Sequence, residues 1–179
     1  SIANLIAIVA ARDYNKLAAK DFDKLVIYST SQAHHCTRKS IKISGLYDAI
    51  QQEVPMDDHF RMNTVRLSEM ITEDLKKGLI PFMVIASAGT TDTGAIDPLK
   101  EIATICKTNA LWFHVDAAYG GFFILSELVK EKLNGIELAD SLVIDPHKGL
   151  FLPYGSGAVL VRNAKWLYDS QHMQANYMQ

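Results

Sequence analysis

The sequence predicts an α/β protein with a mostly parallel sheet, helices on both faces and one antiparallel strand. Three observations predict this class. The candidate strands are continuously apolar, which is typical of a parallel sheet covered on both faces. Helical patterns alternate with these strands along the chain. The last strand follows its predecessor after too few residues for a crossover helix, so it should run antiparallel.

The elements follow one another with ordinary start and stop signals. Apolar runs such as "KLVIYS" and "PFMVIAS" predict strands over 24–29, 81–87, 111–116, 141–146 and 156–162. Amphipathic patterns predict helices near 2–12, 33–43, 68–77, 98–108 and 124–132. Asp97 and Pro98 predict an N-cap and the first helical residue, and Gly78 predicts a helix end. We expect one domain spanning residues 1–179.

Composition excludes several classes of function. The chain is 49% apolar with a formal net charge of −2, so no electrostatic footprint for nucleic acid is expected. Its apolar runs are too short to cross a bilayer, and no leader pattern opens it. Cys36 and Cys106 have no ligand-like spacing, which favours a reducing compartment such as the cytoplasm. We therefore expect a small-molecule partner, with no metal and no membrane.

Polar side chains gather where the predicted strands end. The strands lead into "STSQAHH", "SAGTTDTG", "DAAYGG" and "DPHKG". Ligands of open α/β sheets bind beyond the carboxyl ends of the strands, so these segments form the candidate site. We expect Gly120, Gly121 and Gly149 to leave the backbone room beside the ligand.

Lys148 is the candidate nucleophile, since a lysine partly removed from water can act as a neutral amine in carbonyl chemistry. The alternative is a solvated cation paired with Asp145. Asp116 could hold a protonated pyridine nitrogen, or it could merely cap the turn "DAAYGG". For stacking on an aromatic cofactor, spacing does not choose between His34 and His35.

A metal site is a further interpretation. His114 and Asp116 lie two apart on one strand and so share a face, and the pair His34 and His35 could add ligands for a hydrolytic metal. Against this, the third ligand is not evident and Lys148 would have no role.

Four segments carry a resemblance to a known family. They are "STSQAHHCTRKS", "GLIPFMVIASAGTTDTGAIDPLKEIATIC", "LWFHVDAAYGGFFIL" and "DSLVIDPHKGLF". In this order they resemble the group II amino-acid decarboxylases that depend on pyridoxal 5'-phosphate (PLP), a family that includes aromatic-amino-acid, histidine and glutamate decarboxylases. The resemblance implies the large domain of an aspartate-aminotransferase-like (fold type I) PLP enzyme, of which this chain is the central part.

The resemblance also implies roles for residues around the cofactor ring. Lys148 looks like the lysine that binds the cofactor covalently, with His147 contacting the cofactor beside it. Asp116 looks like the partner of the pyridine nitrogen, and Ala118 like the small residue on one face of the ring.

Further roles follow from the same resemblance. His34, rather than His35, looks like the imidazole stacked on the other face of the ring, and Ser87 lies where the family places a hydroxyl near the ring hydroxyl. Asp145 falls at the phosphate end, where the family often has Asn and where a carboxylate would repel a phosphate. Ser1 would open the helix that follows the family's phosphate loop.

The implied function is decarboxylation of an L-amino acid to its amine and CO2 by a cytoplasmic homodimer, in the longer parent of this chain. Two alternatives remain open. A PLP-dependent carbon-carbon lyase of the retro-aldol type uses a similar lysine and aspartate, and the isolated fragment could be catalytically inactive.

Overall fold

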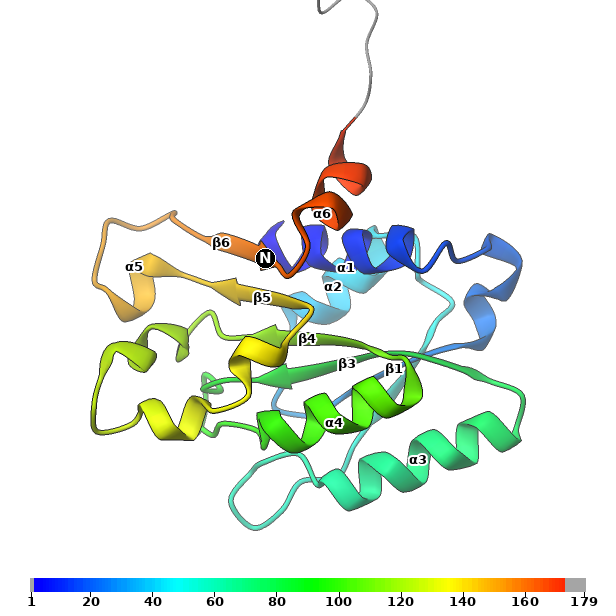
Figure 1. Ribbon diagram of the computed structural model, residues 1–179, viewed down its shortest axis with the longest axis horizontal. Coiled ribbons are helices and arrows are strands. Elements are labelled where there is room, and N and C mark those ends of the chain that lie inside the picture. Colours follow the sequence, from blue (N-terminus) through cyan, green and yellow to red (C-terminus); the bar gives the residue numbers. More distant parts are fainter. Residues whose placement is uncertain (1, 173–179) are drawn as a thin grey trace, which may run out of the picture.

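The computed structural model describes residues 2–172, and within them the strands form one six-stranded sheet in the order β2-β1-β3-β4-β5-β6 (Figure 1). The strands are β1 (Leu25–Ser29), β2 (Ile50–Glu53), β3 (Ile80–Ser87), β4 (Trp112–Asp116), β5 (Ser141–Ile144) and β6 (Ala158–Val161). Neighbouring strands from β2 to β5 pair in parallel, and β6 pairs antiparallel with β5. The mixed sheet expected from the sequence is confirmed.

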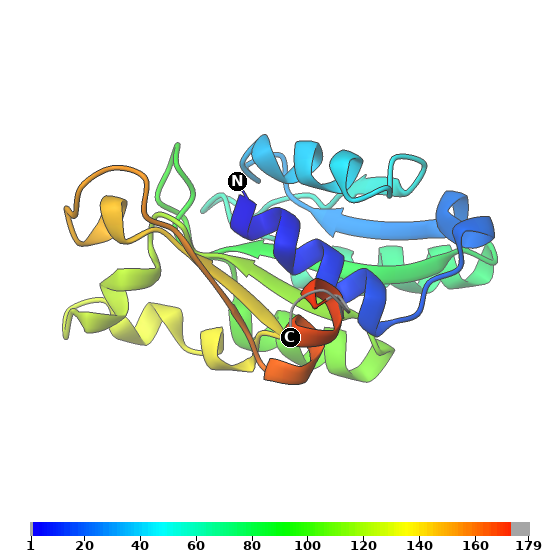
Figure 2. The same cartoon turned by 90° about the horizontal axis from the view of Figure 1, so that it is seen from above.

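The helices cover both faces of this sheet. They are α1 (Ile2–Tyr14), α2 (Cys36–Ile43), α3 (Thr64–Lys76), α4 (Leu99–Asn109), α5 (Pro146–Gly149) and α6 (Ala164–Gln171). α1 lies between α2 and α6 over one face (Figure 2), while α3 and α4 cover the other (Figure 1). Within residues 2–172, no helix is long and apolar enough to cross a membrane.

Side-chain alternation along the strands divides the core into two layers. In β1, Leu25 and Ile27 pack in the cluster that contains Ile8 of α1, whereas Val26 and Tyr28 pack in the cluster of α3 and α4. The side chains that form both layers are buried, as expected when each face of a sheet meets helices. The sheet is therefore a rigid base for the loops at its carboxyl edge.

Several predicted elements need correction. Residues 124–132 do not form an α-helix: the chain there makes two 3₁₀ segments, Gly121–Leu125 and Lys130–Leu133. The short edge strand β2 was not predicted, because its burial alternates and its sequence "IQQE" is mostly polar. α3 begins at Thr64, four residues before the predicted start, since the side chain of Asn63 accepts the Arg66 N–H at 3.0 Å.

Asp97 does not cap α4. Its carboxylate oxygens instead accept the backbone N–H groups of Met62 and Ser87, both at 2.7 Å. Asp97 is buried, and burial raises the pKa of its carboxyl group. The side chain therefore ties a distant loop to the last residue of β3. The predicted end of α3 is confirmed, since Gly78 follows it with φ +76°.

Candidate active site

A cavity of about 680 Å³ opens at the carboxyl ends of the strands. The residues within 2–172 to which the family resemblance gives a role at the cofactor all line this cavity: His34, Ser87, Asp116, Ala118, Asp145, His147 and Lys148. Ser1 lies outside the described residues. The volume is in the ordinary range for a small-molecule site. The cavity thus collects side chains from loops that are far apart in the sequence.

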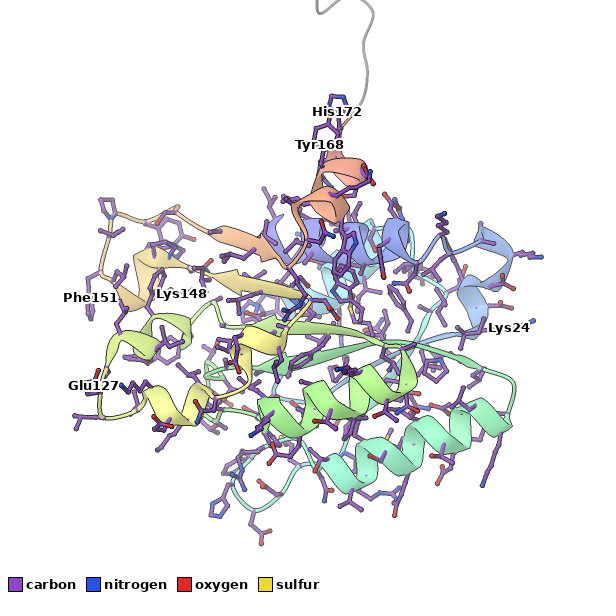
Figure 3. The ribbon with its side chains drawn as sticks, in the orientation of Figure 1. Lys24, Glu127, Lys148, Phe151, Tyr168 and His172 are labelled. Carbon is purple, nitrogen blue, oxygen red and sulfur yellow. The ribbon has the colours of Figure 1, made fainter. Side chains whose placement is uncertain are left out.

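The sheet register explains this convergence. Ser87, the last residue of β3, pairs with Asp116, the last residue of β4, and Asp116 pairs in turn with Val143 of β5. The polar residues that follow these strands therefore leave the sheet at the same edge. Pro146 begins α5 one residue after the end of β5, and this short helix carries Lys148 (Figure 3), whose side chain lines the cavity.

Lys148 is both a cavity residue and half of an ion pair. Its Nζ lies 3.1 Å from Oδ2 of Asp145, and the Lys148 side chain is 36% exposed. The pairing with Asp145 considered from the sequence is therefore present, and it is compatible with a position at the cavity wall. The amine is accessible, but its ion pair with the Asp145 carboxylate has to break before the amine can react.

Asp116 lies at the end of β4 with both carboxylate oxygens engaged. Oδ1 accepts the Ala118 N–H at 3.2 Å, and Oδ2 accepts an N–H of the Asn4 side chain at 3.0 Å. The turn-capping interpretation is thus correct in geometry, but the same carboxylate also faces the cavity. Each oxygen thus accepts one N–H donor, and the two donors hold the carboxylate in a fixed position at the cavity wall.

His34 lines the cavity, while His35 is exposed and is not part of the lining. The two rings lie 4.1 Å apart between centroids, and Nδ1 of His34 accepts the N–H of Cys36 at 3.2 Å. Burial lowers the pKa of His34, the charges of His35 and Lys148 lower it further, and the charge of Asp116 opposes them. These influences show that His34, Asp116 and Lys148 share one electrostatic environment.

His147 is held at the wall beside α5. Its Nδ1 donates to the carbonyl oxygen of Ser156, and its ring meets that of Tyr154 edge to face at 4.9 Å. The loop that leads into β6 therefore fixes the imidazole. Tyr154 itself lines the cavity and is 94% exposed.

The glycines singled out from the sequence have a different role from the one expected. A Cβ at Gly120 would lie 2.2 Å from the carbonyl oxygen of Ala88, and one at Gly121 would lie 2.7 Å from a methyl group of Ile144. Gly149 is similarly close to Phe122. These glycines allow protein segments to pack together, and none of the three lines the cavity.

The glycines that do line the cavity were not singled out from the sequence, although one of them lies in the predicted site segment "SAGTTDTG". They are Gly89, Gly155 and Gly157. Gly89 has φ +89°, and a Cβ at Gly157 would lie 2.9 Å from Oδ1 of Asp145. Turn signals in "SAGTTDTG" and "PYGSG" could have pointed to them, although such signals are common in loops without function.

Asn4 is the most informative residue that sequence reasoning missed. It lies in the first turn of α1, is 2% exposed, and contacts Asp116 directly. The available signal was a single polar residue inside the apolar run "SIANLIAIVAAR". Buried polar side chains need partners, so an Asn at a core position already implies a polar neighbour.

The structure does not support the metal interpretation. Both ring nitrogens of His114 are engaged, Nδ1 with Ser141 Oγ and Nε2 with Asn4 Oδ1, each at 2.8 Å. In the part of the chain that the structure describes, no group of three or more His, Cys, Asp or Glu side chains has the arrangement of a metal site.

The mixed sheet, with a lysine and an aspartate lining one cavity at its carboxyl edge, resembles the structures of PLP-dependent decarboxylases of the fold type I class. The chain belongs to the pyridoxal-dependent decarboxylase family, whose conserved domain matches residues 1–179.

Individual relatives agree with this assignment. The chain is 40% identical to an aromatic-L-amino-acid decarboxylase of Bacillus atrophaeus, over 99% of this chain and 37% of that protein. The structure of Oryza sativa TDC with PLP and tryptamine superposes with a TM-score of 0.91 at 29% identity, over 99% of this chain and 38% of that one. The structure of mouse CSAD superposes with a TM-score of 0.87 at 33% identity, over 97% of this chain and 38% of that one. The chain thus spans under two fifths of the length of these relatives.

Proposed function

We propose that the protein containing this chain decarboxylates an L-amino acid, giving the corresponding amine and CO2, with PLP as cofactor. One observation carries the proposal: Lys148 and Asp116, which come from different strand ends, line one cavity together with His34. Membership of the pyridoxal-dependent decarboxylase family supports the same chemistry.

The residues present fit this cofactor. Lys148 offers an accessible amine for its aldehyde, and Asp116 offers a carboxylate that already accepts two N–H donors. His34 and Ala118 are the candidates for its two ring faces, and Ser87 for its ring hydroxyl. When bound, PLP supplies an electron sink for the bond that breaks at the α-carbon of the substrate.

The chain's own residues would bind and orient the cofactor and the substrate. Asp116 would hold the proton on the pyridine nitrogen, because an ionised carboxylate stabilises a neighbouring cation. His34 would keep the ring in place and would be neutral near pH 7, since its pKa lies below the ordinary value. Lys148 would release its amine from Asp145 and later be available to move a proton at the α-carbon.

The part of the cavity that would hold the phosphate of PLP has the residues that fit the cofactor least well. The first turn of α1 lines the cavity through Ile2 and Ala3, and a helix N-terminus attracts anions. His147 lies on the same wall as Asp145. The Asp145 carboxylate would oppose a phosphate there unless its charge stays paired with a cation.

We also propose that the protein acts as a cytoplasmic homodimer. Leu128, Phe151 and Tyr154 are each more than nine tenths exposed, and Phe151 projects from the end of the molecule that carries Lys148 (Figure 3). Since Tyr154 also lines the cavity, a second copy covering this surface would help to close it. The free buried thiols Cys36 and Cys106 suit a reducing compartment.

The test is a substrate panel. The protein, with any flanking sequence that its gene encodes, is incubated with PLP and single aromatic or acidic L-amino acids, and CO2 and amine are quantified. We expect equal amounts of both products from at least one amino acid. Aldehyde release from a phosphorylated amino alcohol, without CO2, would instead support the carbon-carbon lyase, which the decarboxylases among the relatives do not favour.

A further inference from the structure

A line of buried polar side chains runs from the sheet to Asp116. Nε1 of Trp112 lies 2.8 Å from Oγ of Ser141, and that oxygen lies 2.8 Å from Nδ1 of His114. Nε2 of His114 lies 2.8 Å from Oδ1 of Asn4, whose Nδ2 lies 3.0 Å from Oδ2 of Asp116. The first four residues of this line are each at most 3% exposed.

The hydrogen bonds of this line run in one direction only. An indole N–H donates and cannot accept, so Ser141 Oγ accepts from Trp112. The hydroxyl proton of Ser141 is then directed to Nδ1 of His114. A neutral imidazole that accepts at Nδ1 carries its proton on Nε2. His114 therefore donates from Nε2 to the Oδ1 atom of Asn4.

The side-chain amide of Asn4 is fixed by this donation. Because Oδ1 accepts from His114, the amide nitrogen faces the other way, toward Cys36 and Asp116. One N–H points to Sγ of Cys36 at 3.3 Å and the other to Oδ2 of Asp116 at 3.0 Å. Asp116 thus receives a donor, where a reversed amide would present an oxygen.

The opposite direction of these hydrogen bonds, with the His114 proton on Nδ1, is unfavourable. If Nδ1 of His114 carried the proton, the hydroxyl proton of Ser141 would be buried without an acceptor among the described residues. Asn4 would then turn its oxygen toward the Asp116 carboxylate. Burial independently keeps His114 neutral, because it lowers the pKa of the imidazole to about 4 against the opposing influences of Asp116 and of a backbone hydrogen bond at Ser141.

We propose that this one-way chain of hydrogen bonds fixes Asp116 as an accepting carboxylate at the cavity wall, with Asn4 and His114 as positioning residues. The inference rests on the proposed function, in which Asp116 holds the pyridine nitrogen of PLP. Neither positioning residue needs to touch the cofactor, and both act through Asp116.

The first test requires no cofactor. Nitrogen-15 NMR of the imidazole of His114 in the cofactor-free chain identifies which nitrogen carries the proton. We expect a neutral ring protonated at Nε2, with slow exchange of that proton. A ring protonated at Nδ1, or a doubly protonated ring at pH 7, would overturn the direction of the chain.

Two variants of Ser141 separate positioning from packing. Ser141→Ala removes the donor to Nδ1, so the proton of His114 should populate both nitrogens. Ser141→Thr keeps a hydroxyl and should restore the Nε2 form. A ring that stays wholly in the Nε2 form in Ser141→Ala would contradict the proposal, whatever the thermal stability of that variant.

The second test measures cofactor binding. Asn4→Asp keeps the shape of the side chain but replaces the donor to Asp116 by a carboxyl oxygen. We expect the affinity for PLP to fall by about tenfold or more, as for loss of a hydrogen bond to a charged group. The matched control is Asn15→Asp, just past the end of α1, where the amide donates to the Ala11 carbonyl.

The outcomes are distinguishable. Wild-type chain that shows no PLP binding would count against the proposed function, while the NMR result would still decide the hydrogen-bond chain. Wild-type and Asn4→Asp chains that bind PLP equally well would count against the positioning role of Asn4 alone.

Discussion

The Nζ atom of Lys148 lies 3.1 Å from Oδ2 of Asp145, three residues earlier in the chain. Asp145 follows β5 at the N-cap position of α5 and Lys148 lies on the single turn of that helix, so the pair spans the start of the helix. The Lys148 side chain is 36% exposed and that of Asp145 is 13% exposed, so water screens the pair. Such ion pairs contribute about 0–1 kcal/mol.

Asp145→Asn is expected to speed covalent attachment of PLP. The amine of Lys148 has to leave the carboxylate before it reacts, and the variant removes that step. The gain should be up to about fivefold, which corresponds to the small energy of a screened pair. Stopped-flow absorbance measures it. The control is Asp169→Asn, which breaks the exposed pair of Lys165 and Asp169 in α6; slower attachment in Asp145→Asn alone would refute the expectation.

Asp116→Asn is expected to reduce turnover by about 10²–10³-fold, the scale found when a preorganised electrostatic group is lost. The amide keeps the shape of the side chain but cannot neutralise a cation on the pyridine nitrogen. Steady-state CO2 release measures the effect. Asp92→Asn, in the exposed loop after β3, is the matched charge change and should be active. Equal turnover of Asp116→Asn and wild type would exclude the assigned role.

His114 should make stability depend on pH. Its pKa falls from 6.5 to about 4 on folding, chiefly through burial. Between these values the unfolded chain binds a proton that the folded chain does not, so stability rises with pH by up to about 1.4 kcal/mol per unit. The contribution of neutral His114 to the free energy of unfolding is complete above pH 6.5 and is lost as the pH falls toward 4.

The comparison with His114→Gln isolates this effect from the carboxyls of buried Asp97 and partly buried Asp140, whose raised pKa values act in the opposite direction. Urea unfolding at pH 4.5, 5.5 and 7, conditions chosen to span that window, gives the slope for each protein. The wild type should have the steeper rise. Parallel pH profiles would show that His114 titrates in the folded state as it does in the unfolded chain.

Gly120→Ala should destabilise the fold by about 1–3 kcal/mol or more, as overpacking does. Its Cβ would lie 2.2 Å from the carbonyl oxygen of Ala88, so the loops after β3 and β4 would have to separate. Gly78→Ala is the contrast: its φ of +76° is strained for alanine, but its Cβ meets nothing within 4 Å. Thermal unfolding compares the two. A Gly120→Ala variant as stable as wild type would mean that these loops are not in contact.

Much of this architecture can be predicted from the sequence because it depends on local patterns. Continuous apolar runs indicate β1, β3, β4 and β5, and the short connection before β6 requires an antiparallel strand. The rule that ligands bind beyond strand ends brings Lys148 and Asp116 to one place before any coordinates are known. The shared cavity confirms that placement.

The features that the sequence did not predict correctly depend on contacts between segments that are far apart in the chain. Asn4 is separated from Asp116 by 112 positions, and its amide contact appears only when α1 packs across the sheet. Asp97 was predicted to cap a helix because it precedes Pro98, but its carboxylate accepts two backbone N–H groups from other segments of the chain. Gly120 seemed to make room for a ligand, but the neighbouring loop fills that space. Local sequence identifies the residue type in each case but not its partner.

The most direct test is to identify the lysine that PLP modifies. The chain is incubated with PLP, reduced with borohydride, digested and examined by mass spectrometry, with Lys165→Ala as a control variant. The reduced adduct should be on Lys148, and Lys148→Ala should lose both the adduct and the visible absorbance band. A stoichiometric adduct on another lysine, or an unchanged band in Lys148→Ala, would contradict the proposed active site.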